Sequence, residues 1–470
     1  MQYLSTRGRA PALGFSDVLL SGLARDGGLF VPATWPEMNP AAIAGLAGRP
    51  YADVAFEVIR PFVGGDISDA DLSRICASAY AGFGHEAVAP LVQLAPGRWV
   101  LELFHGPTLA FKDIAMQLLA RLIDHVLAKR GRRVTIVGAT SGDTGAAAIE
   151  AFGGHDNADV FILFPQGRVS PIQQRQMTTA GAPNVHAIAI KGTFDDCQTI
   201  VKGLFNDAGF RQRVGLAGVN SINWARILGQ IVYYFSAAVA LGAPGRPVSF
   251  TVPTGNFGDI FAGYAAKRMG LPVDRLVVAT NVNDILVRAI TGGEYRPGAV
   301  SATASPSMDI QVSSNFERLL FEVYDRDGAT VDGLMGGLAS AGGFAVSAGA
   351  RRRIAADFDA GRADEAETAA EIGATYAATG FLADPHTAVG LAVARRFSRP
   401  EVPMICLATA HPAKFPAVVR AAANVEPVAP PRLAGLGNQR ERFTVVANDR
   451  QAVADHIVQR TRARRESVMS

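Results

Sequence analysis

One lysine lies where its side-chain amine could act as a nucleophile. Lys112 follows a strand-like run, 99–104, and opens an apolar helical stretch, 114–127, with Phe111 beside it. Partial burial and the positive end of a helix both lower a lysine pKa, and an uncharged amine forms a Schiff base with an aldehyde. A surface lysine that closes a loop is the alternative on spacing alone. His105, earlier in the same loop, is either a catalytic base or a structural histidine.

Two glycine-rich turns each follow a strand-like run and open a helix. The first, 138–146, reads GATSGDTGA, and the second, 253–259, reads PTGNFGD. Backbone amides at a helix N-terminus point at a common anion, which the helix dipole also favours. We therefore expect a carboxylate or phosphate at the first turn and a phosphate at the second. The second turn lacks the GxGxxG and Walker lysine patterns, which argues against a dinucleotide or a nucleoside triphosphate. Ordinary strand-to-helix turns are the alternative.

Two further segments carry weaker signals. Thr409 ends a strand-like run, so its hydroxyl could face a ligand ring, although a purely structural threonine is the alternative. Ser221, Asn223 and Arg226 lie within six residues and could grip a phosphate, because arginine offers a bidentate fork. A helix cap with a salt bridge is the alternative there. Together the segments indicate a reactive lysine, two anion-binding turns and a neutral partner for a ring.

Short apolar runs rich in β-branched residues alternate with helical stretches after about residue 95. The strand-like runs lie at 99–104, 134–137, 160–164, 185–190, 248–252, 276–279 and 404–407. Strands buried on both faces of a parallel sheet have this character, and ligands bind beyond their carboxyl ends. The sequence predicts an α/β fold with two parallel-type sheets flanked by helices and a mostly helical N-terminal unit. Helix starts are expected at Ser68, at Ser170 with Pro171, and at Thr193.

Composition excludes several classes of protein. The chain has 470 residues, of which 49% are hydrophobic and 19% charged, and its net charge is +3, which favours a globular protein and predicts neither nucleic-acid nor membrane binding. The longest apolar stretch, 227–243, is interrupted by polar residues and predicts a buried core helix. Cys76, Cys197 and Cys406 form no CxxC pair, so neither a disulfide framework nor a metal site is expected. No signal peptide is visible at the N-terminus, and a cytoplasmic location is predicted.

The sequence resembles the threonine synthase family, in its shorter class found in bacteria and fungi, over nearly the whole chain. Similar segments occur in the family's order: YLSTRG at 3–8, FHGPTLAFKD at 104–113, GATSGDTG at 138–145, SPIQQRQM at 170–177, NSINWARI at 220–227, PTGNFGDI at 253–260 and LATAHPAKFP at 407–416. FHGPTLAFKD and PTGNFGDI together are highly specific. The resemblance implies a fold-type-II pyridoxal-phosphate enzyme of the tryptophan-synthase-β-like group. Its activity would be β,γ-elimination and replacement, converting O-phospho-L-homoserine and water to L-threonine and phosphate, the last step of threonine biosynthesis.

The resemblance also implies a role for each candidate residue. Lys112 would form the Schiff base with pyridoxal 5'-phosphate and act as the base, and Thr409 would hydrogen-bond the pyridine nitrogen and leave the ring neutral. The cofactor phosphate would be held by Gly255, Asn256, Phe257 and Gly258; the substrate carboxylate by Thr140, Ser141, Gly142, Asp143 and Thr144; and the substrate phosphate by Ser221, Asn223 and Arg226.

Three regions are expected. Residues 1–95 would form an N-terminal mostly helical domain, 96–220 a catalytic region with the lysine and the substrate-carboxylate loop, and 221–470 a large cofactor-binding region with the phosphate loop. Another fold-type-II enzyme, such as a serine or threonine dehydratase, and a non-catalytic ligand-binding homologue are the alternatives. The oligomeric state is predicted only as monomer or homodimer.

Overall fold

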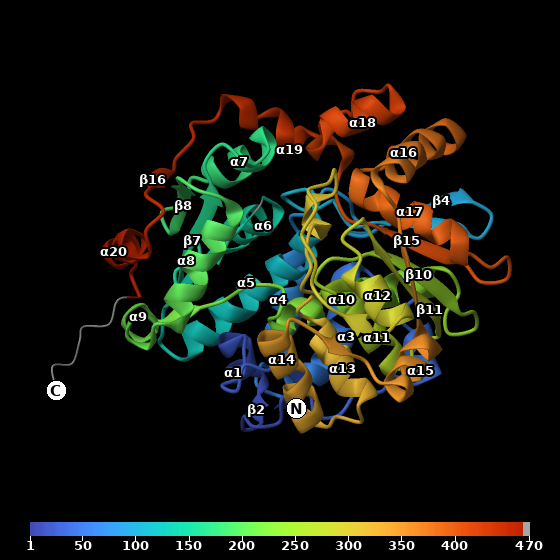
Figure 1. Ribbon diagram of the computed structural model, residues 1–470, viewed down its shortest axis with the longest axis horizontal. Helices are drawn as coiled ribbons and strands as arrows, with labels where there is room; N and C mark the ends of the chain where they lie inside the picture. The colour runs from blue at the N-terminus through green and yellow to red at the C-terminus, as the bar shows by residue number, and fades with distance from the viewer. Residues whose placement is uncertain (141, 464–470) are drawn as a thin grey trace.

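Two separate sheets carry the loops of interest, as the alternating pattern predicted (Figure 1). The computed structural model describes residues 1–140 and 142–463, so the candidate Ser141 lies outside the described residues. The larger sheet has six strands, and only its last, edge pairing is antiparallel. Its order is β14 (Phe358–Arg362), β11 (Val273–Thr280), β10 (Val248–Pro253), β15 (Met404–Ala408), β5 (Arg98–Glu102) and β4 (Leu91–Ala95). The smaller sheet is parallel throughout, in the order β16 (Thr444–Val446), β8 (Val185–Ile190), β7 (Ala158–Pro165), β6 (Val134–Ala139) and β9 (Leu216–Ala217).

All seven predicted strands are present, with shifts of a few residues at their ends. The strands that the sequence did not reveal in these two sheets are β4, β9, β14 and β16, and each of them lies at the edge of a sheet. An edge strand is partly exposed and does not need a continuous apolar run. The burial of β16 and β14 is accordingly incomplete, whereas every residue of β7 and β10 is buried.

The regions expected from the sequence do not coincide with the sheets. The strands β4 and β5 form a hairpin within the larger sheet, so a boundary at residue 95 would divide that hairpin. The C-terminal strand β16 and helix α20 (Arg450–Arg460) pack on the smaller sheet and its helix α8 (Phe194–Asn206). Figure 1 shows this C-terminal segment, in red, running from α18 (Pro416–Ala423) past α7 (Pro171–Thr178) to α20. Strand pairing between distant segments leaves no local signal, which is why the expected boundaries differ.

The N-terminal unit is mostly helical, as predicted, and also contains a small antiparallel sheet, β2-β1-β3. Its elements are β1 (Gln2–Ser5), β2 (Leu13–Gly14), α1 (Phe15–Ser21), β3 (Phe30–Pro32), α2 (Pro40–Ala44), α3 (Tyr51–Val63) and α4 (Asp69–Tyr80). The predicted helix caps at Ser68, Ser170 and Thr193 are confirmed, because each side chain accepts a hydrogen bond from a backbone amide of its helix. These local signals needed no tertiary information.

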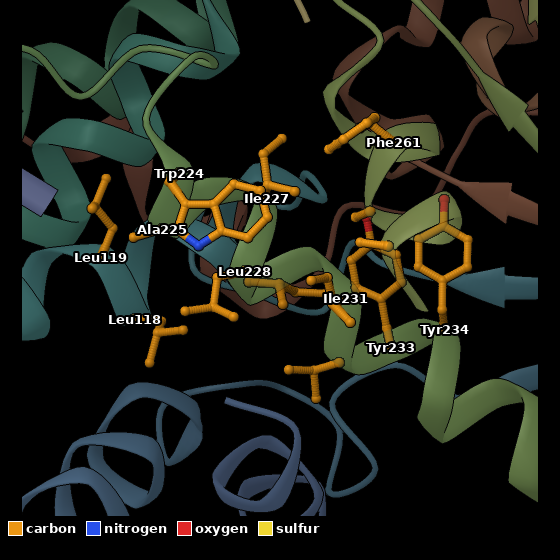
Figure 2. Close-up of a cluster of buried hydrophobic side chains, with 14 of the residues drawn as sticks. Leu118, Leu119, Trp224, Ala225, Ile227, Leu228, Ile231, Tyr233, Tyr234 and Phe261 are labelled. Carbon is orange, nitrogen blue, oxygen red and sulfur yellow. The ribbon is translucent and has the colours of Figure 1, made fainter. Parts of the chain in front are cut away.

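Three long helices form the core beneath the candidate site (Figure 2). They are α5 (Lys112–Lys129), α10 (Trp224–Ala240) and α11 (Gly258–Arg268). The predicted core helix in the apolar stretch is confirmed as α10, which is buried along nearly its whole length and places Trp224 among the largest buried side chains. Within residues 1–140 and 142–463, no helix combines the length and the apolar character that crossing a membrane requires.

The remaining helices surround these layers. They are α6 (Asp143–Phe152), α9 (Ala208–Val214), α12 (Ile285–Thr291), α13 (Phe316–Val323), α14 (Gly328–Ala341), α15 (Ala348–Asp357), α16 (Glu365–Thr379), α17 (Pro385–Phe397) and α19 (Pro431–Ala434), with short 3-10 turns η1 (Pro306–Met308), η2 (Pro412–Lys414) and η3 (Leu436–Asn438) and the hairpin β12 (Glu294–Tyr295) and β13 (Phe344–Ala345). The start of α6 and the turns η1 and η2 contribute residues to the candidate site, and the start of α17 contacts η1.

Gly263 is required where α11 packs against α10 and β11. A Cβ atom there would lie 2.7 Å from the ring of Tyr234 and 2.8 Å from Leu276, and the Tyr234 hydroxyl is fixed by Asp259. We expect Gly263→Ala to destabilise the protein by about 1–3 kcal/mol through overpacking. Gly333→Ala, in a helix with open space around it, should be neutral or stabilising by up to about 1 kcal/mol. The thermal unfolding midpoints of the two variants should be measured. Equal midpoints would contradict the close packing inferred at Gly263.

Candidate active site

Lys112 and Thr409 are held side by side although nearly three hundred residues separate them. The loop before Lys112 pairs with the residues after β15: Ala110 forms a bridge with Ala410, and the Phe111 amide donates to the Thr409 carbonyl at 2.9 Å. Since β5 and β15 are parallel neighbours, their carboxyl ends deliver both segments to the same place. The structure therefore brings together two groups that the sequence had assigned to one ligand.

The Lys112 amine is buried and makes two polar contacts. Its Nζ donates to Ser307 Oγ at 3.4 Å and lies 3.5 Å from an oxygen of Asp143, and it also sits 4.8 Å from the centre of the Phe111 ring. Burial lowers the pKa of Lys112, and this effect exceeds the opposing attraction of Asp143. The buried position that the sequence predicted for this amine is thus present, and the amine loses its proton at a lower pH than an exposed lysine.

Asp143 is shared by two lysines. Its other oxygen lies 2.7 Å from the Lys414 amine and accepts a hydrogen bond from Gln173 at 2.9 Å. Burial alone would raise the pKa of Asp143, but Lys414 and Lys112 hold it well below its usual range. A fixed negative charge repels a second carboxylate. Of the Asp143 groups, therefore, only the backbone amide suits the predicted contact with a substrate carboxylate.

The rest of the turn at 140–144 has a tightly constrained backbone. The Thr140 hydroxyl accepts from the amides of Gly142 and Gly145, at 2.9 Å each, and so stabilises the start of α6. Gly142 has a φ of +149°, and a Cβ atom there would lie 2.3 Å from the Gln173 side chain. Thr144 is half-buried. The Thr140 side chain thus shapes the turn, which leaves ligand contacts to other groups of this segment.

The turn at 255–258 offers free backbone amides at the start of α11. Its carbonyls point away: Gly255 O accepts from Ser313 Oγ at 2.8 Å, and Asn256 O accepts from the Asn315 amide and side chain. Among the described residues, no acceptor is bound by the amides of 255–258. Amides at a helix N-terminus without internal partners form an anion site.

This turn lies close to the lysine. A Cβ atom on Gly255 would lie 2.8 Å from the Ser307 carbonyl, and Ser307 is the residue that contacts Lys112. Phe257 has a φ of +62°, and its ring is buried against Phe316. A Cβ atom on Gly258 would lie 3.2 Å from the Asn315 side chain. Ser307 therefore connects the amine and the anion-binding turn.

In the segment 221–226, Asn223 caps a helix and Arg226 is a cation without an ion-pair partner among the described residues. Asn223 accepts from the Ala225 amide at 3.0 Å and donates one of its two amide hydrogens to the Leu19 carbonyl at 2.9 Å. Its other amide hydrogen has no acceptor among the described residues, so the predicted phosphate contact of Asn223 is compatible with the cap and stays a prediction. Arg226 is buried, makes no ion pair with any described residue, and has an unpartnered Nε. Burial lowers the pKa of Arg226 to about 10, which leaves it charged at neutral pH.

The remaining candidates have clear surroundings. Ser221 is half-buried, and its carbonyl accepts from Asn315 at 3.2 Å. The Thr409 hydroxyl makes no hydrogen bond with the described residues, whereas its amide donates to Thr387 Oγ1 at 3.3 Å. His105 contacts Glu102 at 2.7 Å, which favours the structural role over that of a base.

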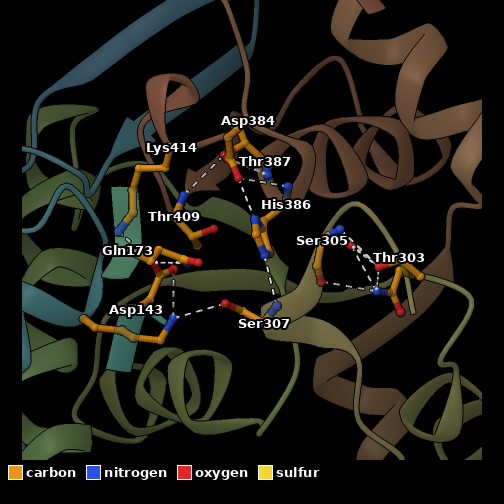
Figure 3. A network of polar contacts seen from close by, with 12 residues as sticks. Asp143, Gln173, Thr303, Ser305, Ser307, Asp384, His386, Thr387, Thr409 and Lys414 are labelled. Carbon is orange, nitrogen blue, oxygen red and sulfur yellow. Dashed lines mark hydrogen bonds and ion pairs between the residues drawn. The ribbon is translucent and has the colours of Figure 1, made fainter. Parts of the chain in front are cut away.

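Several residues of the site carried no function in the sequence analysis. Figure 3 shows five of them, Gln173, Ser307, Asp384, His386 and Lys414, and the other two are Ser313 and Asn315. Gln173 and Lys414 lie inside segments that resemble the family, and the positive charge of Lys414 in an apolar segment was a usable signal, whereas a neutral glutamine gives none. The 307–315 segment has no regular pattern, and among the remaining residues only the Asp-Pro helix start at 384–385 was a usable signal.

The arrangement fits the cofactor that the resemblance implies. A buried amine suits an aldehyde, the free amides of 255–258 suit a phosphate, and the Thr409 hydroxyl without a described partner suits a ring nitrogen. Arg226, which has no ion-pair partner among the described residues, could bind a second anionic group.

Comparisons with known proteins agree with this geometry. A family model described as threonine synthase N terminus matches residues 2–80, one described as pyridoxal-phosphate dependent enzyme matches 83–334, and one described as threonine synthase, C-terminal, matches 387–457. A threonine synthase from Pseudomonas aeruginosa is 55% identical over 451 residues, which cover 96% of each chain. The crystal structure of PLP-bound threonine synthase from Brucella melitensis is 59% identical, with a TM-score of 0.97, and the match covers 98% of this chain and 100% of that one. Threonine synthase from yeast is 39% identical, with a TM-score of 0.93 and 98% coverage of both chains.

The pairing with Asp143 predicts how the Lys112 amine titrates. Because Asp143 raises the pKa of Lys112, the Asp143→Asn variant should have a lower Lys112 pKa and a larger neutral fraction at any given pH. Reductive methylation of cofactor-free protein, followed by peptide mass spectrometry, should show Lys112 reacting at lower pH than in the wild type. Exposed Lys129, on the same helix, serves as the control and should not change. A shift of Lys112 reactivity to higher pH would refute the assignment.

Proposed function

This chain belongs to the threonine synthase family of pyridoxal-phosphate-dependent enzymes, and on that premise we propose that it converts O-phospho-L-homoserine and water to L-threonine and phosphate. One observation carries the proposal. A buried, readily neutralised lysine lies in the same site as a buried arginine that makes no ion pair with the described residues. The lysine, Lys112, suits the cofactor, and the arginine, Arg226, suits the phosphate that this substrate bears.

The residues that would hold the cofactor are those described above. Lys112 would hold the aldehyde carbon, the amides of 255–258 the phosphate, and the Thr409 hydroxyl the ring nitrogen. When bound, pyridoxal phosphate supplies an electron sink that acidifies the protons near the substrate amine. A hydroxyl, unlike a carboxylate, leaves the ring nitrogen uncharged, so Thr409 would moderate that sink.

Lys112 would move the protons of the reaction. As a neutral amine it removes the proton at the substrate Cα and later returns it, while Ser307 Oγ and Asp143 keep the amine in place. Overall, the Cγ–O bond and one Cβ–H bond break, Cγ gains a proton and becomes the methyl group, and water supplies the hydroxyl at Cβ and a proton to the leaving phosphate. Lys414 pairs with the other oxygen of Asp143 at 2.7 Å, so the carboxylate keeps an ion-pair partner throughout.

The two ends of the substrate would bind on opposite sides of Lys112. Arg226 would receive the phosphate together with Ser221 and the second amide hydrogen of Asn223, which also caps the helix that carries Arg226. The turn at 140–144 would receive the carboxylate through the amides of Asp143 and Thr144, the Thr144 hydroxyl and Ser141. Thr140 and Gly142 would shape the turn, and the Asp143 side chain would not take part.

Compartment and assembly complete the proposal. Three buried free cysteines suit a reducing compartment, so we propose that the enzyme works in the cytoplasm. Its assembly as a monomer or homodimer stays a prediction.

Two alternatives differ from this proposal in what they require. A serine or threonine dehydratase acts on substrates without phosphate, so it has no use for a buried, unpaired Arg226. A non-catalytic homologue does not need a lysine amine whose pKa is lowered. Formation of threonine and phosphate from O-phospho-L-homoserine, with no ammonia or oxo acid formed from serine, separates all three.

Replacing Lys112 should remove turnover. We expect Lys112→Ala to lower kcat by at least about 10³-fold, because both the cofactor link and the base are lost. The visible absorption band of the bound cofactor should shift in the same variant. Lys202→Ala, at an exposed position, should retain wild-type activity. Threonine formation at wild-type rate by Lys112→Ala would overturn the assignment.

Arg226 should determine affinity for the phosphate group. We expect Arg226→Gln to raise KM for O-phospho-L-homoserine by about 10- to 100-fold, because a charged hydrogen bond to phosphate is lost. Inhibition by inorganic phosphate should weaken in parallel. Arg226→Lys keeps the positive charge but loses the two-pronged guanidinium, so its KM should lie between those of the wild type and Arg226→Gln. An unchanged KM in a folded Arg226→Gln variant would remove this residue from the phosphate site.

A further inference from the structure

The Asp384 carboxylate accepts more hydrogen bonds than a helix cap requires. It is buried at the N-cap of α17 and accepts from the backbone amides of His386 and Thr387, at 3.0 Å each, as caps do. It also accepts from the His386 ring, at 2.6 Å, and from the Thr387 hydroxyl. Those two side chains lead onward from Asp384 toward the active site (Figure 3).

The first side chain, His386, has a defined tautomer. Its Nε2 lies 3.2 Å from the Ser307 backbone amide, which can only donate, so Nε2 carries the lone pair. Its Nδ1 then carries the hydrogen that Asp384 accepts. The ring is therefore neutral while both contacts hold, and it fixes the backbone of Ser307 rather than offering a proton.

Ser307 faces both parts of the cofactor site. Its hydroxyl accepts from Lys112 Nζ at 3.4 Å. Its carbonyl packs against Gly255 so closely that a Cβ atom on Gly255 would lie 2.8 Å from the carbonyl oxygen. A shift of the η1 turn would move the partner of the amine and the wall of the anion-binding turn together. Because His386 holds the Ser307 amide, it controls this shift.

The second side chain, Thr387, contacts the segment that carries Thr409. Its hydroxyl donates its only hydrogen to Asp384 and accepts from the Thr409 amide at 3.3 Å. The Thr409 carbonyl in turn accepts from the amide of Phe111, next to Lys112. One carboxylate thus links both segments that flank the lysine.

We propose that Asp384, through His386 and Thr387, is a positioning residue that sets the placement of Lys112 and Thr409 relative to each other, with His386 in its Nδ1–H tautomer. The inference rests on the proposed roles of Lys112 and Thr409. The two groups belong to different elements, and misplacement by about 1 Å costs on the order of 10²-fold in rate. The positions of the reacting groups, more than the substrate-binding arginine, should respond to changes in this network.

The tautomer can be tested in the wild-type protein. Nitrogen-15 histidine NMR at about pH 8, in cofactor-free and cofactor-loaded protein, should show one ring with hydrogen on Nδ1 and a bare Nε2. The signals are assigned by their loss in the His386→Asn spectrum. A His386 ring with hydrogen on Nε2 would overturn the proposal, and this measurement does not depend on activity.

Matched substitutions separate positioning from folding. His386→Asn keeps a donor near Asp384 but removes the acceptor for Ser307, whereas His386→Gln offers an acceptor near the position of Nε2. We expect His386→Asn to lower kcat by about tenfold or more, with KM within about twofold, and to weaken cofactor binding to the cofactor-free protein by about fivefold. His386→Gln should recover part of both losses. Equal losses in both variants that track their unfolding midpoints would show a merely structural role and refute the proposal.

A second cap serves as the control for Asp384. Asp364 caps the neighbouring helix α16 and lies outside the site. Asp384→Asn and Asp364→Asn both retain a capping oxygen, so only the former should lower kcat. Wild-type kcat in Asp384→Asn would contradict the proposal. If the wild type makes no threonine from O-phospho-L-homoserine, the proposed function fails, while the NMR and cofactor-binding measurements still decide this inference.

Discussion

Asp143 holds two buried lysine amines at different distances, 2.7 Å for Lys414 and 3.5 Å for Lys112. A buried ammonium needs a close partner, and Lys414 takes that position while also donating to the Thr108 carbonyl. Lys112 is left with the weaker pairing, so the effect of burial prevails and its pKa falls. The unequal sharing gives the two lysines different surroundings: Lys414 has the close ion pair, and Lys112 has the weaker one and a lowered pKa.

The site forms where strands of both sheets end. Lys112 follows β5 of the larger sheet, whereas Asp143 follows β6 of the smaller sheet, and their contact joins the two. Parallel strands direct their carboxyl ends to one edge, where loops from distant parts of the chain can meet. The C-terminal segment also connects the sheets, because it leaves α18 and adds β16 to the smaller sheet. Movement of one sheet relative to the other would therefore change the surroundings of Lys112 first.

Prediction from sequence succeeded where a signal was contained in a few adjacent residues. The buried strands β7 and β10 were visible as apolar runs, and Ser68 and Thr193 as helix caps. It failed for edge strands, whose partly exposed residues lack such runs, and the division into three regions stays a prediction. Asn223 was predicted only as a phosphate ligand, whereas the structure shows that it also caps its helix.

The sequence by itself determined the fold class, the reactive lysine motif and the glycine turns, because those depend on local backbone preference and on hydrophobic periodicity. Only the tertiary structure decided which groups surround the Lys112 amine. Ser307 lies in a segment without a regular pattern and His386 in the first turn of α17, and their contacts span 195 residues of chain from Lys112 to Ser307 and 79 from Ser307 to His386. Such contacts follow from the order in which strands pair within each sheet, and no short stretch of sequence encodes that order.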